Sequence, residues 1–570
     1  MSHARLLADF KARIEKFVEC YLANYKPFPD RDRPEPRIIH DPVWGSNEFF
    51  SWEVAILDSP LLQRLRLVKQ VGFAHLVYPA ARHSRFDHTL GVVSVVSRIV
   101  RGLNSKRRGS GEAVDKKTEY ALRMAAVLHD VGHCLLSHVA ERIYSRRPEY
   151  RAAALELSNR YHVSPKPHEV MSYYIIKSRR FVEFFKEIKR DPLIADETFR
   201  KYVHLDFIAK AIIGYWDRSR PLERFHVEII NGPLDADKLD YLARDAQFAG
   251  LSVVYDFNRY MVTVRSTEES FVGLDGEDQE TQSLRLPMKG ATSLEQILIS
   301  KMMLYSYLYH QQKALSAEAM LLEFFEPFSR GETLRFGSAP VEHPVDLLYL
   351  TDESLEGLLH PSAAALEEAS DLPRRLALRR LVKRALVISR LFVVGLEYAS
   401  GTPQRDNAVR GFTEMDRCMS SPDGRREFRG KLVDLVRTQI DDADKRNAFH
   451  EESVLISWPK PPDVSEAEHM IVPFEHDGGE PTALTKLFPL REWAYSYAAT
   501  QWKGYVFCQP GYRAHVQEAA IQLIKDTFGI EMSDEAKALS GVPSVDEKLS
   551  PQPHELDEIP PLLRLLEESD

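Results

Sequence analysis

The sequence is poor in the features that mark secreted and membrane-spanning proteins. Four cysteines occur in 570 residues, and no two of them form a CxxC pair. That spacing fits neither a zinc motif nor a disulfide framework, so we expect reduced thiols in a cytoplasmic protein. The first residues contain no signal-peptide core, and we find no run of about 18 uncharged apolar residues, so no membrane association is expected.

The chain also lacks an excess of positive charge. Lys plus Arg number 75 against 84 Asp plus Glu, which gives a net charge of −9. A protein that coats duplex nucleic acid needs a basic surface, so nucleic acid is not expected as a partner, although this charge balance does not exclude it. Apolar residues make up 44% of the chain, enough for a large core.

Helical periodicity dominates the first half of the chain. Residues 1–25 indicate an amphipathic helix, and the proline-rich stretch that follows indicates a linker. Apolar residues recur at helical intervals over Lys117–Tyr144, which predicts one helix. Tyr260–Ser266 and Ser283–Met288 alternate like strands and predict a hairpin with a long tip.

The second half is mixed in character. The Leu- and Arg-rich stretch Asp371–Tyr398 predicts helix, as do Glu492–Trp502 and Gly511–Phe528. Strands are predicted at Ser453–Trp458 and near Tyr505–Cys508. The tail beyond about residue 542 is acidic and rich in proline, which predicts disorder.

Four segments gather the residue types that bind metals and phosphates. They are RHSRFDHTLG at 82–91, LHDVGHCLLSH at 128–138, His168–Glu169 and NGPLDADKLDYLARD at 231–245. Imidazole and carboxylate together suit a divalent first-row transition ion. His129 and Asp130 are neighbours, so one helical turn can offer two ligands, and His133 lies four residues later on the same face of a predicted helix.

Two further spacings indicate a reaction site. Asp237, Tyr241, Arg244 and Asp245 share one face of a helix, where a purely structural helix would place apolar residues. His138 and Glu141 are three residues apart, so the carboxylate can orient the imidazole for proton transfer.

In this order the four segments resemble the HD-domain deoxynucleoside triphosphate triphosphohydrolases, a family that includes bacterial dGTPases. The resemblance is dense from Arg37 to Leu251 and loose as far as Met320; no SAM domain, known from vertebrate members, precedes it. It implies a mainly α fold, with an HD-domain helical phosphohydrolase core, a small β-hairpin and a mixed, mostly helical C-terminal region. We expect an N-terminal helix and linker at 1–37, the HD domain at 38–330, the C-terminal region at 331–541 and the tail at 542–570.

The resemblance also implies the residues of the site. It places one metal ion, which could be Mn, Fe, Zn or Ni, on His88, His129, Asp130 and Asp237, with Mg as a further activator left open. It gives catalytic roles to His133, His138, Glu141 and His168.

Substrate contacts follow from the same resemblance. It assigns phosphates to Arg85, Lys238 and Lys301, the sugar 3′-hydroxyl to Gln70 and Asp245, and walls that exclude a 2′-hydroxyl to Tyr241 and Tyr309. Lys301 stands at an Arg position of the family, so the charge is kept but the planar fork is lost.

The resemblance leaves allostery open. Asp58 and Arg66 match positions that bind an activating nucleotide in the vertebrate enzyme, but Gln311 and Gln312 stand where that family has His and Lys. Family members are often oligomers, so we expect a homo-oligomer.

The expected reaction cleaves a dNTP into a deoxynucleoside and inorganic triphosphate, with His138, oriented by Glu141, protonating the departing 5′-oxygen. An HD-type nucleotidase, phosphodiesterase or nuclease is the first alternative. The second alternative is a nucleotide-sensing HD module without turnover. Base preference, the native metal and the role of residues 331–570 are not determined by the sequence.

Overall fold

The structure is a computed structural model that describes residues 2–28, 35–105, 113–217, 219, 223–253, 255–272, 278–336, 339–356, 371–398, 400–461, 471–472, 482–483, 488–489, 492–493, 496–497 and 500–542. The chain divides into two compact units. The first comprises Met1–Ala314, Phe325–Ser354 and Pro462–Ala494, and the second comprises Leu315–Phe324, Leu355–Pro461 and Tyr495–Asp570. The tail predicted at 542–570 lies, except for residue 542, outside the described residues.

The first unit is built mainly from helices. Its helices are α1 (His3–Leu22), α2 (Ser51–Leu57), α3 (Pro60–Gln63), α4 (Arg85–Asn104), α5 (Lys116–Leu128), α6 (His138–Tyr144), α7 (Pro148–Tyr161), α8 (Pro167–Lys177), α9 (Arg179–Arg190), α10 (Glu197–Tyr202), α11 (Leu205–Ile212), α12 (Arg224–Ile230), α13 (Ala236–Ala249), α14 (Phe257–Thr263), α15 (Ala291–Leu304) and α17 (Glu326–Ser329). A π-helical turn, η5 (Tyr305–Tyr309), follows α15, and α16 (Gln312–Phe324) and α18 (Asp352–Glu356) run from the first unit into the second.

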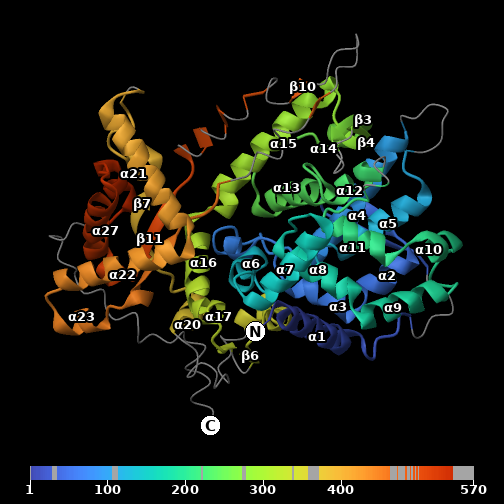
Figure 1. The fold of residues 1–570 in the computed structure, drawn as a ribbon, viewed down its shortest axis with the longest axis horizontal. Helices are drawn as coiled ribbons and strands as arrows, with labels where there is room; N and C mark the ends of the chain where they lie inside the picture. Colours follow the sequence, from blue (N-terminus) through green and yellow to red (C-terminus); the bar gives the residue numbers. More distant parts are fainter. Residues whose placement is uncertain are drawn as a thin grey trace. The chain divides into compact units, whose positions relative to one another are not determined.

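Helix α4 lies at the centre of the first unit. It packs against α5, α12, α13 and α14, and these helices lie together in Figure 1. Almost every side chain of its first four turns is buried, because neighbours cover it on several sides. A residue near the start of α4 is therefore placed deep in the domain, where a polar side chain needs a partner.

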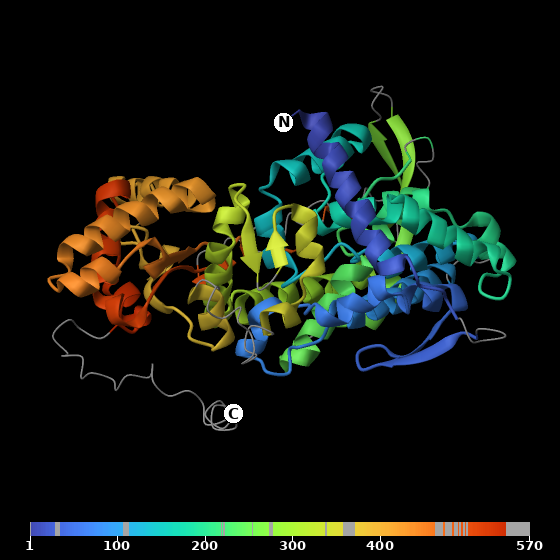
Figure 2. The same ribbon diagram turned by 90° about the horizontal axis from the view of Figure 1, so that it is seen from below.

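Short antiparallel pairs complete the first unit. They are β1 (Arg37–Asp41) with β2 (Gly45–Phe49), β3 (Arg265–Val272) with β4 (Asp278–Arg285), β5 (Leu334–Phe336) with β6 (Ala339–Val341), and β9 (Ile471–Val472) with β10 (Thr482–Ala483). Figure 2 shows β3 and β4 as two green arrows that stand out from the helices of this unit.

A hairpin forms here as predicted, but both strands were misplaced, since β3 and β4 occupy most of the stretch that was expected to form the long tip. The strand expected at Tyr260–Ser266 is mostly the helix α14, and β3 begins at Arg265. The Asp256 side chain caps α14 by accepting a hydrogen bond from the Arg259 backbone at 2.8 Å. Burial of Phe257 and Tyr260 then favours the helix over the alternating pattern.

The second unit contains a three-stranded antiparallel sheet in the order β7 (Lys383–Ile388), β11 (Gly504–Cys508), β8 (Val454–Ser457). Its helices are α20 (Asp371–Ala377), α21 (Pro403–Ser420), α22 (Pro422–Gln439), α23 (Ala443–Ala448), α27 (Arg513–Phe528) and α28 (Asp534–Ser540). Helix α27 packs on β7 and on α21 and α22, in the orange and red part of Figure 1.

Two of the predicted strands and one helix of this unit agree with the structure, and one helix does not. The strands predicted at Ser453–Trp458 and near Tyr505–Cys508 correspond to β8 and β11, and the helix predicted at Gly511–Phe528 corresponds to α27. The helix predicted over Asp371–Tyr398 ends at Ala377, and β7 follows. Pairing with β11, which is remote in sequence, makes this apolar run a strand. Of the helix predicted at Glu492–Trp502, residues 492–493, 496–497 and 500 are helical, whereas residues 494–495 and 498–499 lie outside the described residues.

In the described part of the chain, no helix is both long enough and apolar enough to cross a bilayer.

A buried ion pair fastens α2 to α5. Arg123 donates to Glu53 through Nε at 2.8 Å and Nη2 at 2.7 Å, and both side chains are buried. Glu53→Gln leaves a buried guanidinium without its charge partner, so we expect the free energy of unfolding to fall by about 3 kcal/mol. Thermal unfolding followed by circular dichroism checks this. Asp206→Asn, in an exposed pair with Lys210, is the control and should shift stability by less than about 0.5 kcal/mol.

Candidate active site

The first turn of α4 carries Arg85 and His88. Ser84 caps this helix by accepting a hydrogen bond from the Asp87 backbone at 3.2 Å, and the Asp87 carboxylate accepts one from the Ser84 backbone at 2.9 Å. This reciprocal pair satisfies two of the terminal N–H groups, and the Arg85 N–H donates to the Val68 carbonyl at 2.8 Å. Arg85 and His88 are both buried, and the cap fixes the start of the helix that carries them.

The His-Asp pair lies at a break between two helices. Helix α5 ends just before His129, and α6 begins at His138. The expectation of one helix over Lys117–Tyr144 is therefore wrong, and so is the helical face that was to join His129 and His133. Tight turns between α5 and α6 bring these side chains together instead.

Tertiary contacts hold this break open. The buried Arg64 guanidinium donates to the His133 carbonyl at 2.7 Å and also to the Val131 carbonyl. The Gly132 N–H donates to Ser172 Oγ at 2.8 Å. A Cβ on Gly132 would collide with the backbone of α8, so this close approach needs glycine. These partners replace the bonds that a continuous helix would make.

The four predicted metal ligands lie together. His88 Nε2 is 3.0 Å from Asp237 Oδ1, 3.7 Å from Asp130 Oδ2 and 3.4 Å from His129 Nε2. His129 Nε2 is 3.3 Å from Asp130 Oδ1. The ligand atoms of His88, His129 and Asp130 all lie within 4.8 Å of one another, so these side chains could hold one ion, with Asp237 beside them.

The electrostatics of this cluster suit a cation. Burial alone would lower the pKa of His88, but hydrogen bonds to Asp237 and Asp240 outweigh it and raise the pKa to about 10. Burial opposes ionisation of Asp130, yet His129 and Arg85 hold its pKa well below the usual range. The carboxylates therefore stay ionised, and a bound divalent ion would supply the positive charge that a His88 proton otherwise provides.

The four predicted catalytic residues form a second cluster. Glu141 Oε1 is 2.6 Å from His168 Nδ1, and Glu141 Oε2 is 3.1 Å from His138 Nδ1. The His133 and His168 rings stack with centroids 4.1 Å apart. These four side chains also have the donors for an ion. However, each oxygen of Glu141 already faces an imidazole, so the cluster balances its charge without a metal.

Charge is distributed unevenly over this cluster. Burial alone would lower the pKa of His168, but Glu141 raises it. Burial, together with the charges of Arg85 and His168, lowers the pKa of His133 well below its ordinary value. The protonated form is thus favoured at His168 and disfavoured at His133. His138 is the exposed member, with 62% of its side chain accessible, and can meet an incoming molecule.

Arg85 connects the two clusters. Its Nη1 donates to Asp130 Oδ2 at 2.9 Å, and its Nη2 is 3.2 Å from His138 Nε2. Its Nε donates to Ser137 Oγ at 2.9 Å. Ser137 has a positive φ of 48°, a conformation that costs a non-glycine residue about 1–3 kcal/mol. This strain at the junction is typical of a functional site.

Asp245 gathers the residues predicted to contact the sugar. Its Oδ2 accepts a hydrogen bond from the Tyr309 hydroxyl at 2.5 Å, and its Oδ1 is 2.7 Å from His83 Nε2. Burial raises the pKa of both Tyr241 and Tyr309. The side-chain oxygen of Gln70 is buried and has no hydrogen-bond partner among the described residues, so it is free to meet a ligand.

Two predicted phosphate contacts have other surroundings. The Lys238 ammonium is 2.7 Å from Asp235 Oδ2 and donates to the Gly232 carbonyl at 2.8 Å. Lys238 would have to leave these partners to reach a phosphate. Lys301 is buried on α15. Phosphate binding by both residues stays a prediction.

Asp58 and Arg66, the predicted allosteric residues, make contacts within the protein, and these contacts give each side chain a structural role without a bound nucleotide. Arg37 binds the Asp58 carboxylate through two nitrogens, at 2.9 and 2.7 Å. Arg66 donates to Gln63 Oε1 at 2.7 Å and lies over the Phe86 ring at 3.9 Å. Nucleotide binding at this surface stays a prediction.

Sequence reasoning missed three residues of the site. Asp240 lies 2.6 Å from His88 Nδ1, and His83 pairs with Asp245. Lys166 Nζ lies 4.0 Å from Asp237 Oδ2. Each lies inside or beside a segment that had been singled out, but the contacts join parts of the chain too distant for spacing to reveal.

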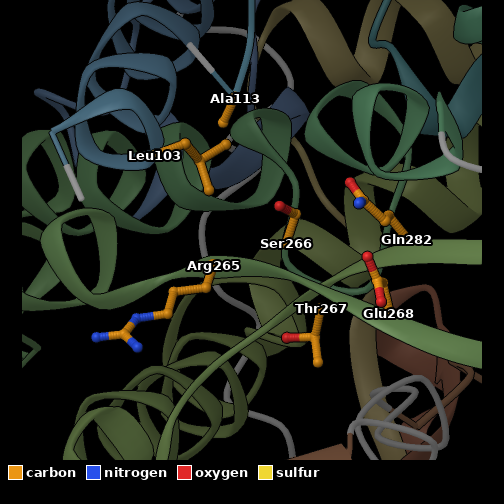
Figure 3. A pocket seen from close by; sticks show the side chains of 7 residues that line it. All are labelled: Leu103, Ala113, Arg265, Ser266, Thr267, Glu268 and Gln282. Carbon is orange, nitrogen blue, oxygen red and sulfur yellow. The ribbon is translucent and has the colours of Figure 1, made fainter. Parts of the chain in front are cut away.

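A separate hollow of about 530 Å³ lies between the end of α4 and the β3–β4 hairpin. Figure 3 shows Arg265, Ser266, Thr267 and Glu268 of β3 lining it with Gln282 of β4 and with Leu103 and Ala113. None of these residues belongs to a predicted site, and no imidazole lines the hollow. It is therefore distinct from the His-Asp cluster.

The family model described as "HD domain" matches residues 85–229, which include His88, His129 and Asp130 but end before Asp237. Residues 85–229 thus match the HD domain. The predicted resemblance is thereby confirmed, and the clusters described above lie in and directly after the matched region.

Curated relatives include two vertebrate enzymes. The chain is 28% identical over 367 residues to the deoxynucleoside triphosphate triphosphohydrolase SAMHD1 of Gallus gallus, covering 61% of this chain and 55% of that protein. It is 30% identical over 244 residues to the enzyme of the same name from Bos taurus, covering 41% and 39%. An uncharacterized protein of Mycoplasma genitalium is 26% identical over 289 residues, covering 50% and 59%. The chain thus spans about half the length of these relatives.

A solved structure shares the fold. A crystal structure of a hypothetical protein from Aquifex aeolicus superposes with a TM-score of 0.53 at 21% identity, covering 85% of this chain and 99% of that chain. At that identity the likeness concerns the fold alone. The expected mainly α fold with an HD-domain core is confirmed.

Proposed function

We propose that this protein is a metal-dependent phosphohydrolase that cleaves a dNTP into a deoxynucleoside and inorganic triphosphate. One observation carries the proposal: a buried cluster of two imidazoles and two carboxylates lies beside an imidazole–carboxylate cluster, and Arg85 contacts both. The names of the vertebrate relatives support the nucleotide class.

Each cluster has its own part in the proposed reaction. A divalent ion on His88, His129, Asp130 and Asp237, when bound, supplies Lewis-acid stabilisation of the charge on the phosphate oxygens. Arg85 adds a fixed positive charge between the two clusters. His168, whose pKa is raised by Glu141, contributes positive charge on the side of His138 when it is protonated.

The bond changes are those of hydrolysis. Water adds its oxygen to the α-phosphorus, and the bond from this phosphorus to the 5′-oxygen breaks. His138, whose Nδ1 lies 3.1 Å from Glu141, gives a proton from Nε2 to the departing oxygen once Nε2 has left its contact with Arg85 Nη2. The proton lost by water restores His138, so one water is consumed for each deoxynucleoside and triphosphate formed.

A direct product assay tests the proposal. Purified protein is incubated with a panel of dNTPs and added Mn²⁺, and the products are separated by chromatography. Inorganic triphosphate with a matching amount of deoxynucleoside is expected. Orthophosphate or pyrophosphate would identify a different HD hydrolase, and binding without turnover would identify a sensing module.

We expect dNTPs to be preferred over NTPs by at least about tenfold in kcat/KM, since a misplaced hydroxyl costs about 1–3 kcal/mol in such pockets. The physical reason is that Tyr241 and Tyr309 are the walls assigned beside the sugar 2′ position, and the Tyr309 hydroxyl is held by a hydrogen bond to Asp245 Oδ2 at 2.5 Å. Rates with dATP and ATP measure the preference. Tyr309→Phe removes one hydroxyl and should reduce the preference for dATP over ATP. Equal rates with dATP and ATP for the wild-type protein would contradict the assignment of the sugar contacts. They would not bear on the assignment of the metal ligands.

A further inference from the structure

Asp240 is a buried carboxylate on the far side of His88 from the metal cluster. Its Oδ2 lies 2.6 Å from His88 Nδ1, and Asp237, one turn earlier on α13, lies 3.0 Å from His88 Nε2. The two nitrogens of the ring are therefore assigned to different neighbours. Nδ1 faces Asp240, and Nε2 faces His129, Asp130 and Asp237.

The position of Asp240 is fixed from three directions. Arg244 donates to it through Nε at 2.9 Å and Nη2 at 3.0 Å. The Trp44 indole N–H donates to Asp240 Oδ1 at 2.5 Å. Gly91 of α4 lies so close that a Cβ there would collide with the Asp240 and Arg244 side chains. A carboxylate with this many partners has no second orientation available.

The turn between β1 and β2 completes the arrangement. Asp41 Oδ2 accepts a hydrogen bond from Arg244 Nη2 at 2.7 Å, and Asp41 Oδ1 accepts from the Val43 and Trp44 backbones at 2.7 and 2.8 Å. This turn is the HDPVWG stretch, 40–45, for which the proposed reaction has no role. It reaches Asp240 both directly, through the Trp44 ring, and indirectly, through Arg244.

We propose that Asp240 is a positioning residue of the metal centre, and that the Asp41–Trp44 turn holds it in place. A neutral imidazole carries one N–H, and an ionised carboxylate can only accept a hydrogen bond. In the neutral form of His88 that can bind a metal ion, the proton therefore lies on Nδ1, and the lone pair of Nε2 faces the other ligands. A carboxylate behind a ligating histidine fixes its tautomer and its ring orientation in this way.

His129 supports the same interpretation independently. Its Nδ1 lies 2.7 Å from the Ala126 carbonyl, which also can only accept a hydrogen bond. Both imidazoles are thus held with Nε2 toward the cluster, one by a backbone group and the other by a side chain. Substitution can therefore test the arrangement at Asp240. The inference rests on a divalent ion binding at the HD centre, not on which nucleotide is cleaved.

The test measures metal binding directly. Metal-stripped full-length protein is titrated with Co²⁺, followed by its visible spectrum and by competition with a chelator. Asp240→Asn keeps the shape but can present an amide N–H to Nδ1, which favours the tautomer with the proton on Nε2. We expect the affinity for Co²⁺ to fall by about 10- to 100-fold, with an altered spectrum.

Two further variants separate positioning from stability. Glu53→Gln makes the same carboxylate-to-amide change at a buried arginine pair that touches no metal ligand, and it should lower the thermal midpoint without weakening Co²⁺ binding. Trp44→Phe removes the indole N–H and should weaken Co²⁺ binding by about two- to tenfold, less than Asp240→Asn does. If Asp240→Asn does not fold, Trp44→Phe serves as the test of the positioning role.

Wild-type affinity and spectrum in Asp240→Asn would overturn the inference. If that variant does not fold, unchanged Co²⁺ binding in Trp44→Phe would overturn it. An equal loss of Co²⁺ binding in Glu53→Gln would do the same, since the effect would then be general destabilisation. Wild-type protein that binds Co²⁺ but releases no triphosphate would reject the proposed reaction and leave this inference standing.

Discussion

His138→Ala is expected to lower turnover by about two to four orders of magnitude, the range for loss of a general acid. His138 Nδ1 lies 3.1 Å from Glu141 Oε2, and 62% of the side chain is exposed. Removing an exposed side chain creates no cavity, so the thermal midpoint should change little. Metal content should also stay near the wild-type value, because His138 is not in the predicted ligand set.

Glu141→Gln is expected to have an effect of intermediate size. Its amide can still pack but supports a less basic imidazole, and Glu141 also holds His168 at 2.6 Å. Turnover, metal content and thermal midpoint are measured on the same preparations. A His138→Ala protein that is folded, metal-loaded and fully active would end the proposed mechanism, because the departing oxygen would then need another acid.

Asp130→Ala is expected to abolish both metal binding and turnover. Wild-type protein should contain about one transition ion per chain, since the site offers one mixed imidazole–carboxylate ligand set. Asp130 lies 3.3 Å from His129 Nε2 and 2.9 Å from Arg85 Nη1. Its removal takes away a ligand and leaves Arg85 buried beside the remaining ligands without its charge partner. Loss of several kcal/mol of charge stabilisation corresponds to a rate lower by at least about a thousandfold.

Elemental analysis of wild-type protein, Asp130→Ala and the buried control Glu53→Gln measures the metal content. The control should be destabilised and keep its ion. Two tightly bound ions in wild-type protein, both lost in Asp130→Ala, would reject the one-metal interpretation and indicate that His133, His138, Glu141 and His168 hold the second.

Much of the site could be predicted because its motif segments resemble a family that holds a metal ion on imidazole and carboxylate ligands. His88, His129, Asp130 and Asp237 were expected to meet, and the structure brings them together. The His138–Glu141 pair follows from its spacing of three residues and is present at 3.1 Å. Local chemistry of this kind is visible in a sequence because neighbours along a helix are also neighbours in space.

Other features depend on contacts between distant parts of the chain. The apolar periodicity over Lys117–Tyr144 continues through the His-Asp pair, yet Arg64 and Ser172 hold residues 129–137 out of helical geometry. The run that became β7 was likewise decided by pairing with β11. Periodicity reports which residues are buried, but it does not report which distant groups compete for the backbone.

The sequence by itself determined which residue types can bind a metal ion, the mainly helical character of the domain and the order of its motifs. The tertiary structure alone decided how those residues are oriented. Asp240 is 152 positions from His88, His83 is 162 from Asp245, and Trp44 is 196 from Asp240. Partners so far apart in the sequence are brought together by tertiary packing, such as the packing of α4 against α13. The apolar periodicity of either segment does not reveal which segment it packs against.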